Sequence, residues 1–196
     1  MKRIFIGGSR KLGKLNHQVM VKLDSIMAHN YTVLIGDANG ADKAIQTYLH
    51  RKNYDNVIVY CIENDCRNNV GNWHINLIKP PHRKRDLSFY QAKDLAMEKD
   101  SDYGFMIWDG FSKGTLHNLL NLLRNEKHTV LYFSRDKNFH TLRKVSDLRV
   151  MLTSCSFSDT ERLLPMLDSI TTVDNASQPL VMETSGKYEA IQPPLF

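Results

Sequence analysis

Three segments of the chain repeat one pattern, in which a short apolar run is followed by a glycine-containing loop and then by residues with helical periodicity. The apolar runs are 2–6, 32–35 and 105–108, and two further runs, 56–62 and 129–133, complete the series. Strands that alternate with helices and carry continuous apolar residues form a parallel sheet that is covered on both faces. The pattern therefore predicts an α/β, Rossmann-like fold with a mostly parallel sheet and helices on both faces.

Helices are predicted from apolar residues spaced three and four apart. They cover about 15–27, 41–49, 87–99 and 116–123. The stretch 63–85 breaks the rhythm with asparagines, two adjacent prolines and a basic run. We expect a long loop there, with one short strand at 73–78.

The strand pattern ends at Phe139, and a small C-terminal helical appendage is expected beyond it. Apolar spacing predicts one helix over 142–152, and a capping box at 158–161 opens another. From Thr171 the chain loses periodicity and collects polar residues and prolines, which is typical of a mobile tail. The predicted organisation is a Rossmann-like domain over 1–139, a helical appendage over 140–170 and a flexible tail over 171–196.

The cysteine count restricts the class of protein. Three cysteines, Cys61, Cys66 and Cys155, without a CxxC spacing argue against a disulfide framework and a zinc site, and they point to a reducing cytoplasm. The apolar run at the N-terminus is too short for a signal peptide, and no run approaches the length of a membrane span. We expect a soluble cytoplasmic protein with no metal, no cofactor and no membrane contact.

The glycine-rich loops carry the side chains from which a ligand site is predicted. The carboxyl ends of parallel strands share one edge of a sheet, where glycine backbone and helix N-termini favour an anion such as phosphate. Hydroxyl and cationic side chains in the loops add hydrogen-bond donors. The predicted ligand-binding residues are Gly7, Gly8, Ser9, Arg10, Gly36, Gly40, Gly110, Ser112, Lys113, Gly114 and Thr115.

Three carboxylates in the same loops, Asp37, Asp42 and Asp109, are the candidate catalytic residues. Carboxylates beside a sugar can accept hydrogen bonds from ribose hydroxyls or stabilise a cationic sugar transition state. Structural alternatives stay open, because Asp37 can cap a helix and Asp42 can interact with the dipole of its own helix. Each loop can also be an ordinary connection between a strand and a helix.

These loops resemble the SLOG superfamily, a Rossmann-like group that includes YspA-like proteins, lonely-guy phosphoribohydrolases and DprA-type DNA-binding proteins. The resemblance rests on residues 7–10, 36–42 and 108–115, spans about 2–134, and is greatest to the YspA-like branch. It implies a pocket for a nucleotide or nucleotide-derived ligand. The protein would then be a sensor or, if an enzyme, a nucleotide N-glycosidase or phosphoribohydrolase-like hydrolase. Because many members self-associate, the resemblance also implies a homodimer.

The chain departs from the lonely-guy pattern at both of its catalytic positions. In that pattern an arginine–lysine pair precedes a methionine, and a glutamate follows the glycine–threonine pair by three residues. Here Lys93-Asp94 precede Met97, and Asn118 stands at the glutamate position. Asparagine cannot act as a general base or stabilise an oxocarbenium ion as a carboxylate would. Any glycosidic chemistry would have to draw its carboxylate from elsewhere, with Asp37, Asp42 and Asp109 as the candidates.

Two other classes of function fit parts of the chain. The basic loop 79–85, with aromatic residues nearby, would suit nucleic acid, the alternative to a small nucleotide ligand, although loops of this kind are commonly just solvated. The helical appendage and the apolar end at 193–196 would suit a module that recruits a partner protein. The formal net charge of +5 is compatible with each of these classes.

Overall fold

The computed structural model describes residues 1–82, 84–85 and 87–175. Its strands are β1 (Arg3–Gly8), β2 (Thr32–Gly36), β3 (Val57–Ile62), β4 (His74–Ile78), β5 (Tyr103–Trp108), β6 (Thr129–Phe133) and β7 (Asn138–Leu142). Its helices are α1 (His17–Ala28), α2 (Ala41–Arg51), α3 (Leu87–Asp100), α4 (Lys113–Arg124), α5 (Val145–Thr153) and α6 (Phe157–Asn175).

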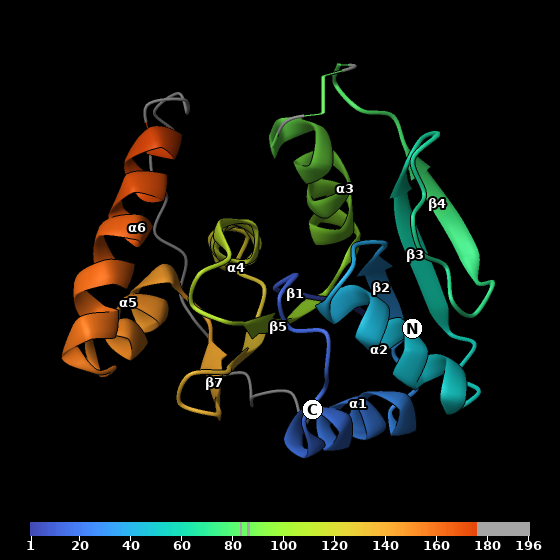
Figure 1. Cartoon of the computed structure of the whole chain (residues 1–196), viewed down its shortest axis with the longest axis horizontal. Helices are drawn as coiled ribbons and strands as arrows, with labels where there is room; N and C mark the ends of the chain where they lie inside the picture. The colour runs from blue at the N-terminus through green and yellow to red at the C-terminus, as the bar shows by residue number, and fades with distance from the viewer. Residues whose placement is uncertain (83, 86, 176–196) are drawn as a thin grey trace, which may run out of the picture.

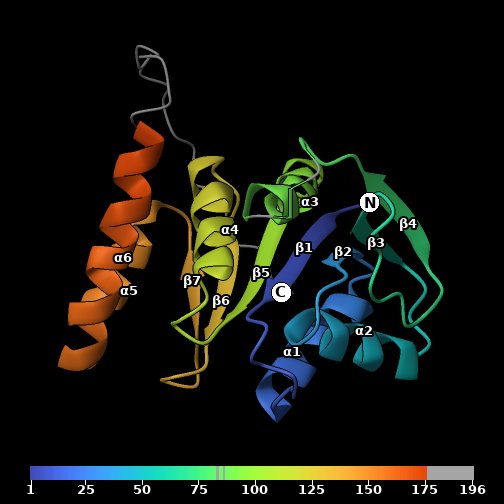
Figure 2. The same ribbon diagram turned by 45° about the horizontal axis from the view of Figure 1, so that its top comes forward.

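The seven strands form one sheet in the order β4-β3-β2-β1-β5-β6-β7, parallel except for β7. The chain moves outward from β1 through β2, β3 and β4, then returns to β5 on the other side of β1 (Figures 1 and 2). In open parallel sheets, ligands bind outside the carboxyl ends of the strands where this direction reverses. The topology therefore places the favoured crevice at the ends of β1 and β5.

Helices cover both faces of the sheet, as the sequence predicts. α1 and α2 lie on one face, while α3 and α4 lie on the other (Figure 1). The core on the α1 side contains Ile4, Ile6 and Val19, and the core on the α4 side contains Phe5, Trp108 and Leu116. Alternate residues of β1 enter opposite cores, which explains why the parallel strands read as continuous apolar runs.

The α/β, Rossmann-like fold is confirmed, and two boundaries differ from expectation. The strand pattern does not end at Phe139, since β7 runs to Leu142 and pairs antiparallel with β6. The boundary expected between 139 and 140 therefore falls inside a strand. α6 continues to Asn175, past the residue at which the tail was expected to begin, and 176–196 lie outside the described residues.

The C-terminal helices pack against the body of the sheet domain. Leu148 and Leu152 of α5 and Leu163 and Leu167 of α6 are buried in the same core as α4. Burial of leucine side chains of this size contributes about 2 kcal/mol each. The expected helical appendage is thus joined by a continuous apolar core to the face of the sheet that α3 and α4 cover.

The expectation that the cysteines are not linked is wrong for one pair. Cys61 and Cys66 form a disulfide, with their Cα atoms 4.9 Å apart. Cys61 lies in β3, and a tight turn with a bridge between Ile62 and Asp65 brings the chain straight back to it. A spacing of five residues becomes a short distance only through this turn, which the sequence pattern did not indicate.

Among the described residues, no helix is both long enough and apolar enough to cross a membrane.

Candidate functional site

A small cavity of about 90 Å³ lies at the carboxyl end of β1, where the strand order reverses. Residues from the ends of β1 and β2, from α3 and from the start of α4 line it. They are Phe5, Gly7, Gly8, Arg10, Ala38, Asp42, Tyr90, Gln91, Lys93, Asp94, Met97, Ser112, Gly114, Thr115 and Asn118. All three predicted glycine-rich loops therefore contribute to a single cavity.

A buried carboxyl and a buried ammonium group meet beside Gly36. A Cβ at Gly36 would stand 2.6 Å from Asp42 Oδ2 and 2.8 Å from Lys93 Nζ, so only glycine leaves room for both groups. Burial raises the pKa of Asp42 to about 6, although the charge of Lys93 opposes the shift. Burial disfavours the charge of Lys93, but the carboxyls of Asp94, Asp42 and Asp37 outweigh it and raise the pKa of Lys93.

A second carboxyl, from Asp94, lines the same cavity. Lys93 Nζ donates to Asp94 Oδ1 at 2.8 Å, and Asn118 Nδ2 donates to Asp94 Oδ2 at 3.3 Å. The glutamate expected from the lonely-guy pattern is absent at 118, but a carboxylate from the facing helix α3 contacts the asparagine there. The cavity thus has two carboxyls, of which only Asp42 was predicted.

Asp37 is not among the residues that line the cavity, and it is held by Arg67, a loop residue that was not predicted from the sequence. Arg67 donates to it from its backbone N at 3.0 Å, from Nε at 3.1 Å and from its terminal nitrogen at 2.7 Å. Burial would raise the pKa of Asp37, but these hydrogen bonds and the charge of Lys93, 3.8 Å away, lower it below its usual value. Asp37 is therefore committed to orienting the loop at Arg67.

Asp109 ties two of the loops together. It accepts from the hydroxyl of Ser9 at 2.9 Å and from the backbone N–H groups of Phe111 and Ser112 at 2.8 and 2.9 Å. Burial would raise its pKa, but these hydrogen bonds lower it. Ser112 in turn caps α4 by accepting from Thr115 N. Asp109 thereby fixes the loop after β5 against the end of β1.

An aromatic ring with two guanidinium groups lies beside this cavity. The Tyr90 ring is 5.6 Å from Arg10 Cζ and 5.3 Å from Arg67 Cζ. Arg10 follows β1, Arg67 follows β3, and Tyr90 belongs to α3. Since Arg10 and Tyr90 both line the cavity, its rim combines positive charge with an aromatic face.

The structure sorts the predicted site residues into two groups. Those lining the cavity are Gly7, Gly8, Arg10, Asp42, Ser112, Gly114 and Thr115. Those with other surroundings are Ser9, Gly36, Asp37, Gly40, Asp109, Gly110 and Lys113. Within the second group, Ser9, Asp37 and Asp109 hold the loops in place through the hydrogen bonds described above.

Tyr90, Lys93 and Asp94 were not predicted as site residues, yet the sequence of α3 carries a signal for one of them. Phe89, Lys93 and Met97 are spaced four apart and are all buried, with 5%, 4% and 1% of their surface exposed. A lysine in the middle of a buried apolar stripe is rarely structural unless it is paired. Lys93 could therefore have been identified as a site residue from its position on the helix.

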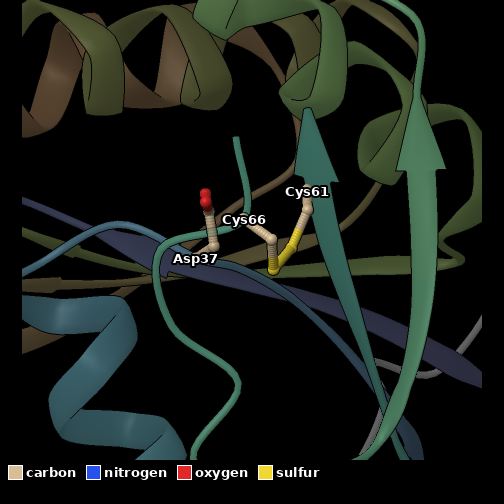
Figure 3. Close-up of side chains that lie close together, drawn as sticks. All are labelled: Asp37, Cys61 and Cys66. Atoms are coloured by element: carbon tan, nitrogen blue, oxygen red, sulfur yellow. A yellow bond between two sulfur atoms is a disulfide. The ribbon is translucent and has the colours of Figure 1, made fainter. Parts of the chain in front are cut away.

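One carboxylate oxygen and two sulfur atoms lie within 4.8 Å of one another; they belong to Asp37, Cys61 and Cys66. The sulfur atoms are bonded to each other, and the Asp37 carboxylate points away from them (Figure 3). Since the carboxylate is also occupied by Arg67, the cluster in this state offers no thiolate and no open carboxylate to a cation.

The larger hollows of the described surface lie elsewhere. One of about 580 Å³ lies between α1 and α2 and is lined by Lys14, Lys43 and Arg51 among others. Another, of about 670 Å³, lies near β7 and α5. Neither is lined by a buried charged residue, whereas the small cavity at the switch point is lined by two, Asp42 and Lys93, so we regard the small cavity as the candidate site.

In the basic loop 79–85, Arg83 lies outside the described residues. Arg85 is 63% exposed and approaches Asp65 at 3.5 Å. Nucleic-acid binding by this loop stays a prediction, as does the homodimer.

Asp42 should make the stability of the protein depend on pH in a defined direction. Its folded pKa is raised, so its contribution to folding is fully present below the unfolded value and is lost as pH rises from about 4 to 6. A shift of about two pK units corresponds to on the order of 3 kcal/mol. We expect the unfolding free energy of the wild type, relative to that of Asp42→Asn, to fall by this amount between about pH 4 and pH 7. Urea titrations at several pH values measure it, and a constant difference would contradict the raised pKa.

The chain matches no protein-family model, and its sequence has no significant match among curated proteins.

Proposed function

We propose that the chain binds a nucleotide or a nucleotide-derived ligand, with its ribose and phosphate in the cavity between α3 and α4. The observation that carries this proposal is the convergence of the three loops on one cavity at the reversal of the strand order. Arg10 and the start of α4 offer donors to a phosphate. Asp42 and Asp94 offer acceptors to ribose hydroxyls. The resemblance of the loops to the SLOG superfamily supports the same class of ligand.

The size of the cavity limits how much of a nucleotide it can hold. Sites that enclose a drug-sized ligand measure about 300–1,000 Å³, whereas this cavity has about 90 Å³. Only the sugar and phosphate would enter, and the base would lie at the rim. Tyr90, with the guanidinium of Arg10 over its ring, is the aromatic surface available to the base there.

The two carboxyls favour cleavage of the N-glycosidic bond over sensing alone. A pair of titratable groups whose environments differ can divide the roles of acid and base between them. Asp42, protonated below about pH 6, would donate its proton to the departing base. Asp94, beside Lys93 and Asn118, would stabilise the positive charge that develops on the sugar. A water molecule would add to the anomeric carbon of the sugar and return a proton to Asp42, so the products would be the free base and a ribose phosphate.

Gly114→Ala separates ligand binding from folding. Gly114 lines the cavity as the second residue of α4, and a Cβ there would meet nothing within 4 Å. Alanine favours a helix over glycine by up to about 1 kcal/mol, so the unfolding free energy should stay equal or rise by about 0.5 kcal/mol. The added methyl group occupies space that the phosphate needs, so the affinity should fall about tenfold, or about 1.4 kcal/mol.

The measurement combines a thermal-shift panel with calorimetry on the full chain. AMP, ribose 5-phosphate and ADP-ribose are compared with adenosine and inorganic phosphate. A ligand at a hundred times its Kd stabilises by about 2.7 kcal/mol, which raises Tm by several degrees for a chain of this size. The proposal fails if no phosphorylated ribose raises Tm, or if Gly114→Ala binds as tightly as the wild type.

A further inference from the structure

The disulfide and the candidate site are connected through a short segment after β3. Cys61 is fully buried in β3, whereas Cys66 is exposed and begins the segment 66–70, which forms no helix or strand. The disulfide thus attaches an irregular segment covalently to β3, the strand beside the edge strand β4.

The same segment supports the floor of the cavity. Arg67 holds Asp37 through three hydrogen bonds, and Asn68 Nδ2 donates to the Asp37 carbonyl at 2.7 Å. Val70 N donates at 2.9 Å to Gln46, whose own amide nitrogen donates to the Gly36 carbonyl at 2.8 Å. Asp37 and Gly36 are the residues against which Lys93 is placed. The segment therefore holds in place the residues that surround the buried charge of Lys93.

We infer that Cys61 and Cys66 are a redox modification site, at which a dithiol reductant releases the segment 66–70 from β3. The geometry directs the attack, because the exposed partner is Cys66 and the buried partner is Cys61. A thiolate of the dithiol bonds to Cys66 Sγ, the Cys61–Cys66 bond breaks, and the electron pair leaves on Cys61 Sγ, which takes up a proton. The second thiolate of the dithiol then displaces Cys66 Sγ, which is protonated in turn. The protein gains two electrons and two protons, and the dithiol becomes a disulfide.

Reduction leaves the segment attached by non-covalent contacts alone. These are hydrogen bonds that are only partly buried, the ion pair of Arg67 with Asp37 and the contact of Arg67 with the Tyr90 ring. A disulfide that closes a short loop restricts the open states of that loop, so its loss makes local opening more frequent. Arg67 then spends more time away from Asp37, and Lys93 loses part of its fixed surroundings. The site would be ordered in the oxidised protein and loosened in the reduced one.

Hydrogen exchange with mass spectrometry tests this inference without any ligand, so its outcome is independent of the proposed function. The full chain is compared before and after treatment with dithiothreitol. We expect backbone amides of 63–72 to exchange about tenfold faster after reduction, while those of β1 and β5 keep their rates. Cys66→Ser should exchange at the fast rate under both conditions. Cys155→Ser, the control, should keep the response to dithiothreitol.

Alkylation with iodoacetamide under denaturing conditions establishes the state of the pair. The inference predicts that Cys61 and Cys66 of the air-oxidised protein are labelled only after reduction. It is overturned if both are labelled without a reductant, or if 63–72 exchanges at one rate in the oxidised and reduced forms.

Discussion

Asp42→Asn is expected to lower kcat for release of the free base from a bound nucleotide by about a hundredfold or more, because a positioned general acid contributes about 10²–10⁴ in rate. Asparagine has nearly the shape of the protonated aspartic acid but has no acidic proton to give. The wild-type rate should also fall as pH rises through about 6, since Asp42 then loses its proton. Chromatographic quantification of the released base measures both effects.

Two further variants make this result specific. Asp24→Asn is the matched control, since Asp24 lies on α1 with its side chain 44% exposed, paired with Lys52, and should keep the wild-type rate. Asp94→Asn should lower the rate because its charge acts on the sugar. It should also move the decline to a lower pH, because the charge of Asp94 helps to raise the pKa of Asp42. Cleavage by Asp42→Asn at the wild-type rate would remove the assignment of Asp42 as the acid.

Gly40→Ala should cause the largest loss of stability of any single methyl group added to the loops. Gly40 precedes α2 with φ +87° and ψ −126°, a conformation that residues with a side chain rarely adopt. A Cβ there would stand 2.1 Å from the carbonyl oxygen of Arg10, which is backbone and cannot turn aside. Strain and steric overlap of this kind cost about 1–3 kcal/mol each, so we expect a loss of about 4 kcal/mol.

Gly13→Ala provides the reference for this measurement. Gly13 belongs to the loop after β1, as Arg10 does, but a Cβ at Gly13 would meet nothing within 4 Å, and its φ is not in the left-handed region. The thermal unfolding midpoint of Gly13→Ala should lie close to that of the wild type, whereas the midpoint of Gly40→Ala should be lower by about 10 °C. Equal midpoints for the two variants would show that the loop at Arg10 changes its conformation and accommodates the methyl group. Gly40 would then not be required for the shape of this turn.

The central strands could be predicted from sequence because both of their faces are buried. β1, β2, β5 and β6 are apolar at nearly every position, so their signal does not depend on register. β7 was missed because it is an antiparallel edge strand of five residues, of which only Leu142 is buried. The glycines at the end of β1 were expected in a loop, yet they continue the pairing with β5 as Gly7 with Met106 and Gly8 with Ile107.

Those parts of the candidate site that depend on residues close together in the sequence could be predicted. Glycines and carboxylates that follow strands marked the loops, and Asp42 lies in the cavity as one of the three candidates. Which carboxyl faces the cavity depends on contacts between distant residues, such as that of Arg67 with Asp37 thirty positions earlier. No local pattern contains such a pairing. The link between Cys61 and Cys66 was missed for a related reason, because it depends on the path of the turn between them.

The contact between α6 and the loop after β5 has a consequence for how the protein can be divided. Arg162 of α6 donates to the Gly110 carbonyl at 2.6 Å, and its guanidinium lies 4.0 Å from the centre of the Phe111 ring. Gly110 and Phe111 directly precede the residues that open α4 beside the cavity. A truncated protein that ends after the sheet would lose α6 and, with it, the contacts by which Arg162 holds this loop. Recombinant fragments designed as the smallest unit that contains the cavity should therefore keep the chain through α6.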